Sequence, residues 1–392
     1  MTHLRSRRSA LAVLLLTAAC SAGSGQPAAP TAAPTWAPTS TSLLPSAATA
    51  RPTTVPHDGL DLYAADRAGR LSAEASQARS LVYVPDASDG TVHVIDPATF
   101  TVVKVEEVGR QPQHVTPSYD LKTLWVDSDM GNSLTPIDPR TGTFGARVPV
   151  ADPYNLYFTA DGRSAVVVAE RLHRLDFRDP HSMKLQQSLQ VPCKGVDHAD
   201  FSADGTHALF SCEFSGQMIW VDMVHRRVER TIALPRQGGR QPKPQDVKMS
   251  PDGDLFYVAD ENSDGLFLID AHTLAVVRFL PTGRGTHGLY VSRDSKDLYI
   301  SNRRGGSVSV LSFATRSVRA TWLVPHGSPD MGGLSADGKV LWLSGRYSGE
   351  VYAISTDDGR LLARIAVGGE PHGLCVWPQP GRYSLGHTGV LR

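Results

Sequence analysis

The sequence predicts an all-β fold, a seven-bladed β-propeller built from four-stranded blades. A motif returns seven times along the chain, and each copy has a polar or His residue, a short apolar run and a Ser-x-Asp-Gly-like turn. Successive turns are 41, 43, 48, 42, 43 and 42 residues apart. A period in the forties with strand-like content is typical of propellers. The copies are Gln111–Asp120, Asp152–Gly162, Val196–Gly205, Pro244–Gly253, Thr286–Ser295, Pro329–Gly338 and Pro371–Pro380.

A second landmark follows each turn and supplies the next strand of each blade. It is an aromatic or branched run that ends in a small or polar residue. A third strand, often ending in Ile-Asp, and a fourth strand complete each repeat, and short apolar or alternating runs between turn residues are typical of strands. The second landmarks are Tyr83–Asp86, Trp125–Ser128, Val167–Glu170, Phe210–Glu213, Tyr257–Asp260, Tyr299–Asn302 and Trp342–Gly345.

The two ends of the repeat region predict how the propeller closes. Residues 80–108 supply three strands with no innermost strand before them, whereas Pro371–Pro378 supplies an innermost strand with no full blade after it. We therefore expect the last strand to complete the first blade, which leaves no free sheet edge. The tail Arg382–Arg392 then lies across the closure or near the channel mouth, and Arg236–Lys243 forms a surface loop in the longest interval.

The first twenty residues indicate export. Arg5, Arg7 and Arg8 precede an apolar run, Ala10–Leu16, and Cys20 follows soon after. A basic segment followed by a short apolar segment is typical of a signal peptide. The pattern resembles a bacterial lipoprotein signal, which implies that Cys20 is lipidated and anchors the mature protein to the bacterial cell membrane; an ordinary signal peptide with an incidental cysteine is the alternative.

The composition of the rest of the chain predicts its domain organisation and the kinds of partner it binds. Residues 21–56 are mostly Ala, Pro, Thr and Ser, so they predict a disordered tether. Residues 57–79 are not repeat-like and predict a short helix or a latch against the propeller, which we place at residues 80–392. The formal net charge of zero gives no indication of a nucleic-acid partner. We expect a monomer.

Polar residues from two parts of each blade are expected to converge at one face of the central channel. Innermost strands begin at this face, and the loops between second and third strands return to it. The strand-entry residues are His114, Asn155, His198, Asp246, His287, Met331 and His372. The loop residues are Asp129, Glu170, Arg171, Glu213, Asp260, Glu261, Arg303 and Arg346.

This funnel is the predicted ligand or partner site, since concave mouths with convergent polar groups favour binding. The guanidinium groups of Arg303 and Arg346 suit an anionic ligand. Two structural alternatives stay open: the histidines hold the blades in register, and the charged residues form salt bridges on a solvated rim. The ligand-binding set comprises His114, His198, Glu213, Asp246, His287, Arg303, Met331, Arg346 and His372.

The histidines do not occupy equivalent positions in their repeats. His114 and His198 lie four residues before the Ser position of the turn, but His287 and His372 lie five before it. Because strand side chains alternate between two faces, the four form one symmetric ring only if a bulge corrects the difference.

The four cysteines are too few for a disulfide scaffold. Cys193 and Cys212 belong to one blade, and an exported protein favours a disulfide between them. Cys375 then remains unpaired. No local pair of residues has metal-ligand spacing, so no metal ligands are assigned; a cluster of His198, Cys212 and Glu213 beside Cys193 is the alternative.

The repeats resemble the YVTN family of propellers. The strands YVPD, YVAD and YISN, the P-x-H entries and the Ser-Pro-Asp-Gly turns carry this resemblance over residues 80–380. The strand entries and the tail segment PGRYSLGHTG are also distantly similar to the haem d1-binding propellers of cytochrome cd1 nitrite reductase relatives. The first resemblance implies the fold, and the second implies tetrapyrrole binding as one candidate role.

We therefore expect an exported, membrane-anchored binding or scaffold protein, with a small-molecule or protein partner at the funnel. Two other classes of function stay open. One is a hydrolase or lyase, lactonase-like, in which a His–carboxylate pair acts as general base and acid. The other is tetrapyrrole or metal handling. The sequence assigns neither a catalytic residue nor a cofactor.

Overall fold

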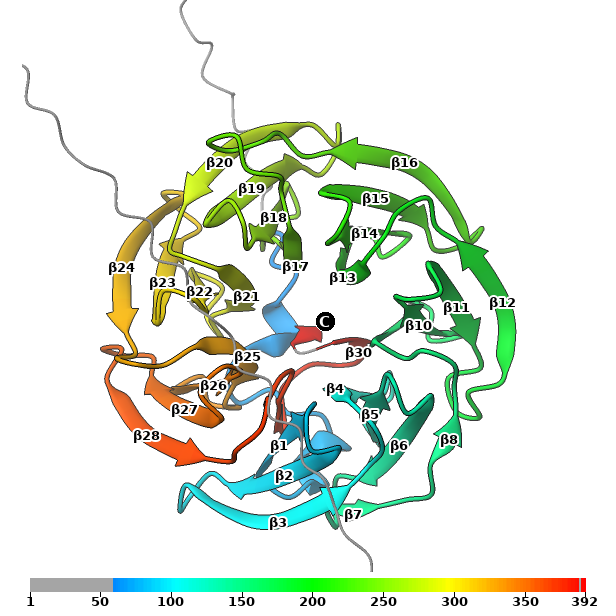
Figure 1. The fold of residues 1–392 in the computed structure, drawn as a ribbon, viewed down its shortest axis with the longest axis vertical. Helices are drawn as coiled ribbons and strands as arrows, with labels where there is room; N and C mark the ends of the chain where they lie inside the picture. The colour runs from blue at the N-terminus through cyan, green and yellow to red at the C-terminus, as the bar shows by residue number, and fades with distance from the viewer. Residues whose placement is uncertain (1–58, 388) are drawn as a thin grey trace, which may run out of the picture. The chain divides into compact units, whose positions relative to one another are not determined.

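The structure, a computed structural model, describes residues 59–387 and 389–392. Seven antiparallel sheets surround a central channel, which confirms the predicted propeller (Figure 1). The predicted signal peptide, Cys20 and the tether lie outside the described residues. Among the described residues, no helix is long and apolar enough to cross a membrane.

The innermost strands line the channel and are buried along their whole length. Six of them have at least one polar residue among their first three positions, whereas β29 has only Cys, Val and Trp. These strands are β4 (Pro112–Pro117), β9 (Asn155–Phe158), β13 (Val196–Phe201), β17 (Pro244–Met249), β21 (Thr286–Val291), β25 (Pro329–Leu334) and β29 (Cys375–Trp377).

The second strands carry the aromatic and branched landmarks and are almost entirely buried between neighbouring blades. Branched and aromatic side chains pack well on such pleated surfaces. They are β1 (Leu81–Asp86), β5 (Leu124–Ser128), β10 (Ala165–Ala169), β14 (His207–Cys212), β18 (Leu255–Asp260), β22 (Asp297–Asn302) and β26 (Val340–Gly345).

The third strands are still mostly buried, whereas the fourth strands face solvent at the perimeter. The third strands are β2 (Thr91–Asp96), β6 (Ser133–Asp138), β11 (Arg174–Arg178), β15 (Gln217–Asp222), β19 (Gly265–Asp270), β23 (Ser307–Ser312) and β27 (Glu350–Ser355). The fourth are β3 (Thr101–Glu107), β7 (Thr143–Phe144) with β8 (Val148–Pro149), β12 (Leu185–Gln190), β16 (Arg227–Ala233), β20 (Val276–Pro281), β24 (Ser317–Leu323) and β28 (Leu361–Ala366).

The chain closes as the sequence predicts. Strand β29 pairs with β1 in an antiparallel register that places Leu81 opposite Trp377 and Tyr83 opposite Cys375. The first blade therefore contains strands from both ends of the repeat region, with the order β29-β1-β2-β3.

The Ser-x-Asp-Gly turns repeat because their side chains bond the turn backbone. The Ser202 hydroxyl donates to the Asp204 carboxylate at 2.7 Å, and the same carboxylate accepts the Thr206 N–H at 3.0 Å. Gly205 has a φ of 70°, a left-handed conformation that glycine adopts at little cost. This turn chemistry is local, so it recurs wherever the short motif recurs.

A β-bulge near the start of most innermost strands shapes the channel wall. In β13 the register with β14 shifts between Val196 and Ala199, which leaves two consecutive residues, Asp197 and His198, within the bulge. The His198 N–H donates to the Ser211 hydroxyl at 3.0 Å, so the small polar residue near the end of the second strand satisfies the bulged backbone. Equivalent contacts join Gly288 to Ser301 and Met331 to Ser344.

The C-terminal tail enters the channel instead of lying only across its mouth. Strand β30 (Ser384–Gly386) pairs with β9, and β31 (Val390–Leu391) pairs with β30, which makes this sheet six-stranded. Gly386 opposes Tyr157, and a Cβ on Gly386 would lie 2.4 Å from the Leu156 carbonyl oxygen. Only glycine therefore permits this close pairing of the tail with the channel wall.

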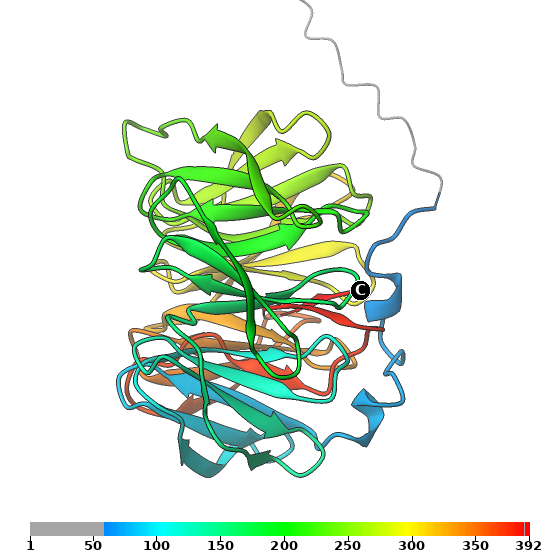
Figure 2. The ribbon, with the colours of Figure 1, turned by 90° about the vertical axis from the view of Figure 1, so that its right-hand side faces the viewer.

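The segment before the propeller packs on the same face as the tail (Figure 2). It contains two short 3₁₀ turns, η1 (Ala64–Asp66) and η2 (Ala75–Gln77). The Tyr63 hydroxyl donates to the Met249 carbonyl oxygen at 2.8 Å, and Asp66 forms a buried ion pair with Arg293. Arg293 lies in a turn of the Ser-x-Asp-Gly type, so latch and tail both cover the face that carries those turns.

Candidate functional site

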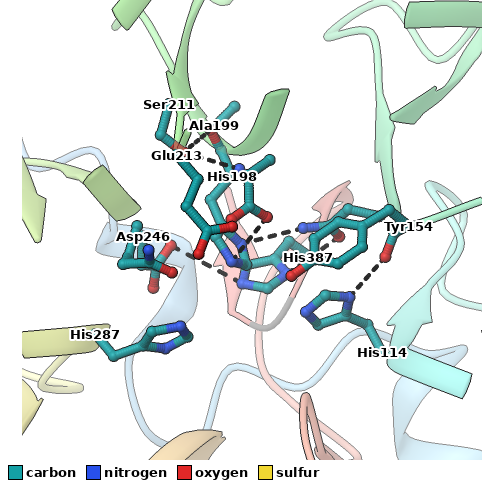
Figure 3. A network of polar contacts seen from close by, with 12 residues as sticks. His114, Tyr154, His198, Ala199, Ser211, Glu213, Asp246, His287 and His387 are labelled. Atoms are coloured by element: carbon teal, nitrogen blue, oxygen red, sulfur yellow. Dashed lines mark hydrogen bonds and ion pairs between the residues drawn. The ribbon is translucent and has the colours of Figure 1, made fainter. Parts of the chain in front are cut away.

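Five histidines meet inside the channel. Figure 3 labels His114, His198, His287 and His387. His114, His198, His287 and His372 come from the entries of four blades, and His387 comes from the tail directly after β30. The His198 and His387 ring centroids are 4.7 Å apart, and His114 lies 4.9 Å from both His387 and His372. His287 lies 5.9 Å from His198 and 6.0 Å from His372. All five side chains are buried.

The bulges resolve the unequal spacing of the histidines. His198 is the third residue of β13, whereas His287 is the second residue of β21. In β21 the register shifts between Thr286 and Leu289, as it does in β13. Side chains at both the second and the third position therefore reach the channel, and strict alternation does not separate the histidines.

One group of three histidines has its nitrogens close enough to share a ligand. His114, His198 and His387 each contribute one ring nitrogen to a set in which all atoms lie within 4.8 Å of one another. The His114 Nδ1–H donates to the Tyr154 carbonyl oxygen at 2.9 Å. Asn155 contacts both other histidines, with its Nδ2 3.2 Å from His198 Nδ1 and its Oδ1 3.2 Å from His387 Nδ1.

A second group contains His287, Asp330 and His372, again with donor atoms within 4.8 Å. His287 Nδ1 lies 3.0 Å from Asp330 Oδ1, and His372 Nε2 lies 3.7 Å from Asp330 Oδ2. Met331, the residue expected to face the site, is buried but belongs to neither group. Asp330, the second residue of β25, lies in the site instead of Met331, because the bulge in β25 turns the side chain of the second residue into the channel.

Burial sets the charge state of the histidines. It lowers the pKa of His198, His287, His372 and His387 well below the usual value, and neighbouring cationic or imidazole groups lower it further. These four imidazoles are therefore neutral at neutral pH. Neutral imidazole is the form that binds metal ions and that can accept a proton.

Several carboxyl groups lie close to one another in the funnel. Burial, followed by the nearby charges of Glu213 and Asp129, raises the pKa of Glu170 to about 8. Burial and the neighbouring Asp152 raise the pKa of Asp129 to about 7. Glu170 is thus largely protonated at neutral pH, and a bound cation would favour release of that proton. Glu213 itself is paired with Lys243 at 2.9 Å.

The two arginines expected to recognise an anion differ in their surroundings. Arg303 is buried, with Nη2 2.6 Å from Glu261 and Nη1 3.4 Å from Asp330, so internal carboxylates already occupy its guanidinium group. Arg346 is more exposed, and its contact with Glu370 is 3.9 Å long. Both guanidinium groups lie near enough to Asp330 to oppose the effect of burial on its pKa, but that of Arg303 already has internal carboxylate partners.

Asp246 lies within the same cluster, with Oδ1 3.9 Å from His387 Nε2. Its other oxygen accepts the Leu289 N–H from the next blade at 2.9 Å. Burial raises the pKa of Asp246 to about 6, despite the nearby Lys248. Asp246 therefore joins two blades and also borders the histidines.

Cys193 and Cys212 form a disulfide with a Cα–Cα distance of 6.0 Å. Cys212 is consequently unavailable as a metal ligand, and the alternative cluster of His198, Cys212 and Glu213 does not form. Cys375 is the free, buried cysteine among the described residues.

Sequence reasoning missed three residues that shape this site. Asp197 and Asp330 each adjoin a residue that was selected, and only the bulges show that both neighbours reach the channel. His387 lies in the tail segment GHTG, which the resemblance to haem d1 propellers included without assigning it a role. Its arrival beside His198 depends on the pairing of β30 with β9.

Comparisons with known proteins agree with the fold. A family model described as a YncE-like β-propeller matches residues 63–380. A YncE protein of Salmonella typhi, itself uncharacterised, is 21% identical over 301 residues, which cover 71% of this chain and 81% of that protein.

Two solved structures are similar in fold at low sequence identity. Dihydro-haem d1 dehydrogenase NirN, solved in complex with DHE, has a TM-score of 0.58 and 15% identity, covering 78% of this chain and 77% of that chain. Virginiamycin B lyase from Staphylococcus aureus has a TM-score of 0.55 and 13% identity, covering 67% and 87%. These likenesses concern the propeller architecture, which hosts unrelated functions.

Proposed function

The chain belongs to the YncE-like β-propeller family, and from that premise we propose that it is an exported, membrane-anchored binding protein whose central channel holds a small ligand. The ligand site is the histidine cluster and the acidic funnel above it. The propeller supplies a rigid wall, and the tail covers one end of the channel.

The observation that carries this proposal is a set of buried polar atoms that lack hydrogen bonds within the described part of the chain. They include His114 Nε2, His372 Nδ1 and Asp197 Oδ2. Each such group costs about 1–3 kcal/mol when it is buried without a partner. A ligand bound in the channel, or water that such a ligand displaces, would supply the missing hydrogen bonds. A scaffold protein that binds its partners only on its outer surface gains nothing from such atoms inside the channel.

The export and anchoring part of the proposal rests on the basic and apolar segments before Cys20. A lipidated Cys20 followed by a Pro-rich tether would hold the propeller clear of the membrane. Replacing Cys20 with Ala should release the protein from the membrane fraction without changing its thermal unfolding. Retention of the Cys20→Ala protein in washed membranes would contradict a lipid anchor.

Native mass spectrometry and elemental analysis test the ligand-binding proposal. The full-length protein is purified without chelators from the cells that produce it. We expect a stoichiometric bound species in the wild type and its loss in His114→Gln or Asp197→Asn at an unchanged circular dichroism spectrum. A wild-type protein that carries nothing, and whose melting temperature no added metal ion, haem or sugar acid raises, would contradict the proposal.

A second candidate is a hydrolase or lyase, and the buried His287–Asp330 pair favours it. With Asp330 3.0 Å from Nδ1, the neutral imidazole is oriented as general bases usually are. Incubation with a panel of lactones and with virginiamycin B tests this candidate. We expect turnover that His287→Gln abolishes at unchanged stability; equal turnover by the variant would exclude His287 as the base.

A further inference from the structure

We propose that His114, His198 and His387 form a binding site for one divalent transition-metal ion of the Zn²⁺ or Cu²⁺ class inside the propeller channel. This inference rests on the proposed binding function and names its ligand. The three donors come from β4, β13 and the tail, so the site exists only in the folded chain.

The distances suit a metal ion after a small adjustment. The three donor nitrogens lie within 4.8 Å of one another, and tetrahedral coordination with metal–nitrogen bonds of about 2.0–2.1 Å requires separations of roughly 3.4 Å. Each donor atom must therefore move inward by less than about 1 Å. Rotation of the imidazole rings about their side-chain bonds supplies a movement of that size.

Hydrogen bonds orient the rings in the manner of metal-bound histidines. A carbonyl oxygen can only accept, so the contact with Tyr154 places the proton of His114 on Nδ1 and leaves Nε2 with its lone pair. Asn155 Oδ1 also accepts the Leu156 N–H at 2.9 Å, which fixes the amide orientation and makes His387 Nδ1 the donor. Such second contacts fix the tautomer and ring orientation of ligating histidines.

A carboxyl group borders each of the other two histidines. The Asn155 Nδ2–H group donates to His198 Nδ1 at 3.2 Å, so the proton of His198 lies on Nε2, which is 3.1 Å from Asp197 Oδ1. His198 Nδ1 is then the nitrogen that can ligate, while Nε2–H keeps its contact with Asp197. His387 Nε2 is 3.9 Å from Asp246. Two carboxylates at the border of a buried site offset the charge of a divalent cation, which is the largest local charge in such a site.

The chemistry of the donors selects the class of ion. Neutral imidazoles suit Zn²⁺, Cu²⁺ and Ni²⁺, whereas Ca²⁺ and Mg²⁺ prefer oxygen ligands. Three protein donors leave a fourth position open, as sites that bind water or a further ligand do.

The neighbouring group of His287, Asp330 and His372 is less suited to an ion. The guanidinium of Arg303 lies 3.4 Å from Asp330, so a fixed positive charge already neutralises its only carboxylate. A divalent cation placed there would be repelled by Arg303. The group therefore serves as the internal comparison for the three-histidine site.

Metal titration of the full-length protein, stripped by a chelator, tests the proposal. Calorimetry with Zn²⁺ should give one ion per chain, and Cu²⁺ should give an electron paramagnetic resonance spectrum with coupling to three nitrogens. We expect His387→Gln and, independently, His114→Gln to weaken binding at least about 100-fold and to leave coupling to two nitrogens, because each removes one direct ligand.

Two matched variants control for other histidines. His207→Gln alters a half-exposed group at the perimeter, where His207 lies 3.2 Å from Glu229 and stacks on Trp220. His272→Gln alters an exposed group in the turn after β19, where His272 Nε2 lies 3.5 Å from Asp254. Both should keep one ion per chain with three-nitrogen coupling, and circular dichroism of every metal-free variant should match the wild type.

Several outcomes would overturn the inference. The first is that the protein binds neither Zn²⁺ nor Cu²⁺ tightly. The second is that His387→Gln and His114→Gln both still bind the ion as tightly as the wild type. The third is that the Cu²⁺ spectrum shows coupling to two nitrogens and is lost only in His372→Gln. If the natively purified protein carries an organic ligand or a tetrapyrrole with a Soret band instead of a single ion, the metal inference fails while the proposed binding function stands. If it carries nothing and binds nothing, both fail.

Discussion

The guanidinium of Arg392 lies 3.0 Å from the carboxylate of Asp200, and both groups are buried. Asp200 belongs to β13, the strand that carries His198, so this ion pair fastens the tail to the wall of the channel. Tyr63 of the latch completes the contact, since the Arg392 guanidinium lies 4.8 Å from its ring centroid. Tail, latch and blade thus meet at one buried charge pair beneath the histidines.

Replacing Arg392 with Leu should lower the free energy of unfolding by about 3 kcal/mol, because removal of one partner leaves a buried charge uncompensated. Hydrogen exchange should become faster in residues 382–392, which Arg392 holds in place. The exposed Arg382 provides the control, and Arg382→Ala should change neither quantity. A double variant, Asp200→Asn with Arg392→Leu, should recover part of the loss; if it is less stable than either single variant, the pair is not the cause.

The disulfide between Cys193 and Cys212 closes a short loop within one blade, with a sequence separation of 19. Constraining a loop of this length should contribute about 3 kcal/mol to the free energy of unfolding. Chemical denaturation of the Cys193→Ala/Cys212→Ala variant measures the loss. Dithiothreitol should lower the melting temperature of the wild type but not that of the double variant, and equal sensitivity of the two proteins would contradict a stabilising disulfide.

Glu261 should make stability depend on pH in acid. Burial acts to raise its pKa, but Arg303 and Lys243, at 2.6 and 2.9 Å, outweigh burial and lower the pKa to about 2. A carboxyl group whose pKa is depressed in the folded state stabilises the fold above its unfolded pKa of about 4.3 and loses that contribution as the pH falls toward 2.

The Glu261→Gln variant tests this dependence. At pH 7 it should be less stable than the wild type by on the order of 3 kcal/mol, and the difference should shrink between about pH 5 and pH 2. Urea denaturation at several pH values measures it. Glu74→Gln, at an exposed position, should be neutral throughout. A stability difference for Glu261→Gln that does not change with pH would mean that the loss is not electrostatic.

Gly373 should control the position of His114. A Cβ at Gly373 would lie 2.0 Å from His114 Cδ2 and 3.0 Å from the Gln113 carbonyl oxygen, so Gly373→Ala must displace the imidazole. We expect this variant to weaken Zn²⁺ binding at least about tenfold while the blades remain folded. Gly333→Ala is the matched control, since its nearest neighbour would be Gln379 Nε2 at 3.2 Å. Unchanged Zn²⁺ affinity in Gly373→Ala would show that His114 is not a ligand.

The fold could be predicted because its signals are local. The contact between Ser202 and Asp204, and the left-handed Gly205, specify a turn within a few residues, and the apolar runs between turns specify strands. Closure through β29 also followed from the sequence, since an unmatched innermost strand at one end of the repeats fits the missing one at the other.

The site could be predicted only in outline. The four entry histidines and Asp246 do converge, but the sequence could not show that bulges bring both the second and the third strand positions into the channel. Asp330 was therefore missed in favour of Met331. For Arg303 the sequence left open both an anionic ligand and a salt bridge, and only the structure shows the ion pair with Glu261 of another blade.

By itself, then, the sequence determined the repeat, the number of blades and the face at which polar residues gather, because each depends on short-range turn and strand patterns. Only the tertiary structure decided which of those residues touch. His387 lies more than 180 residues from His198 in the sequence, and it reaches the channel because Gly386 allows the tail to pair with β9. A contact between residues so far apart in the sequence is not part of any repeated local pattern, so it cannot be predicted from the repeats.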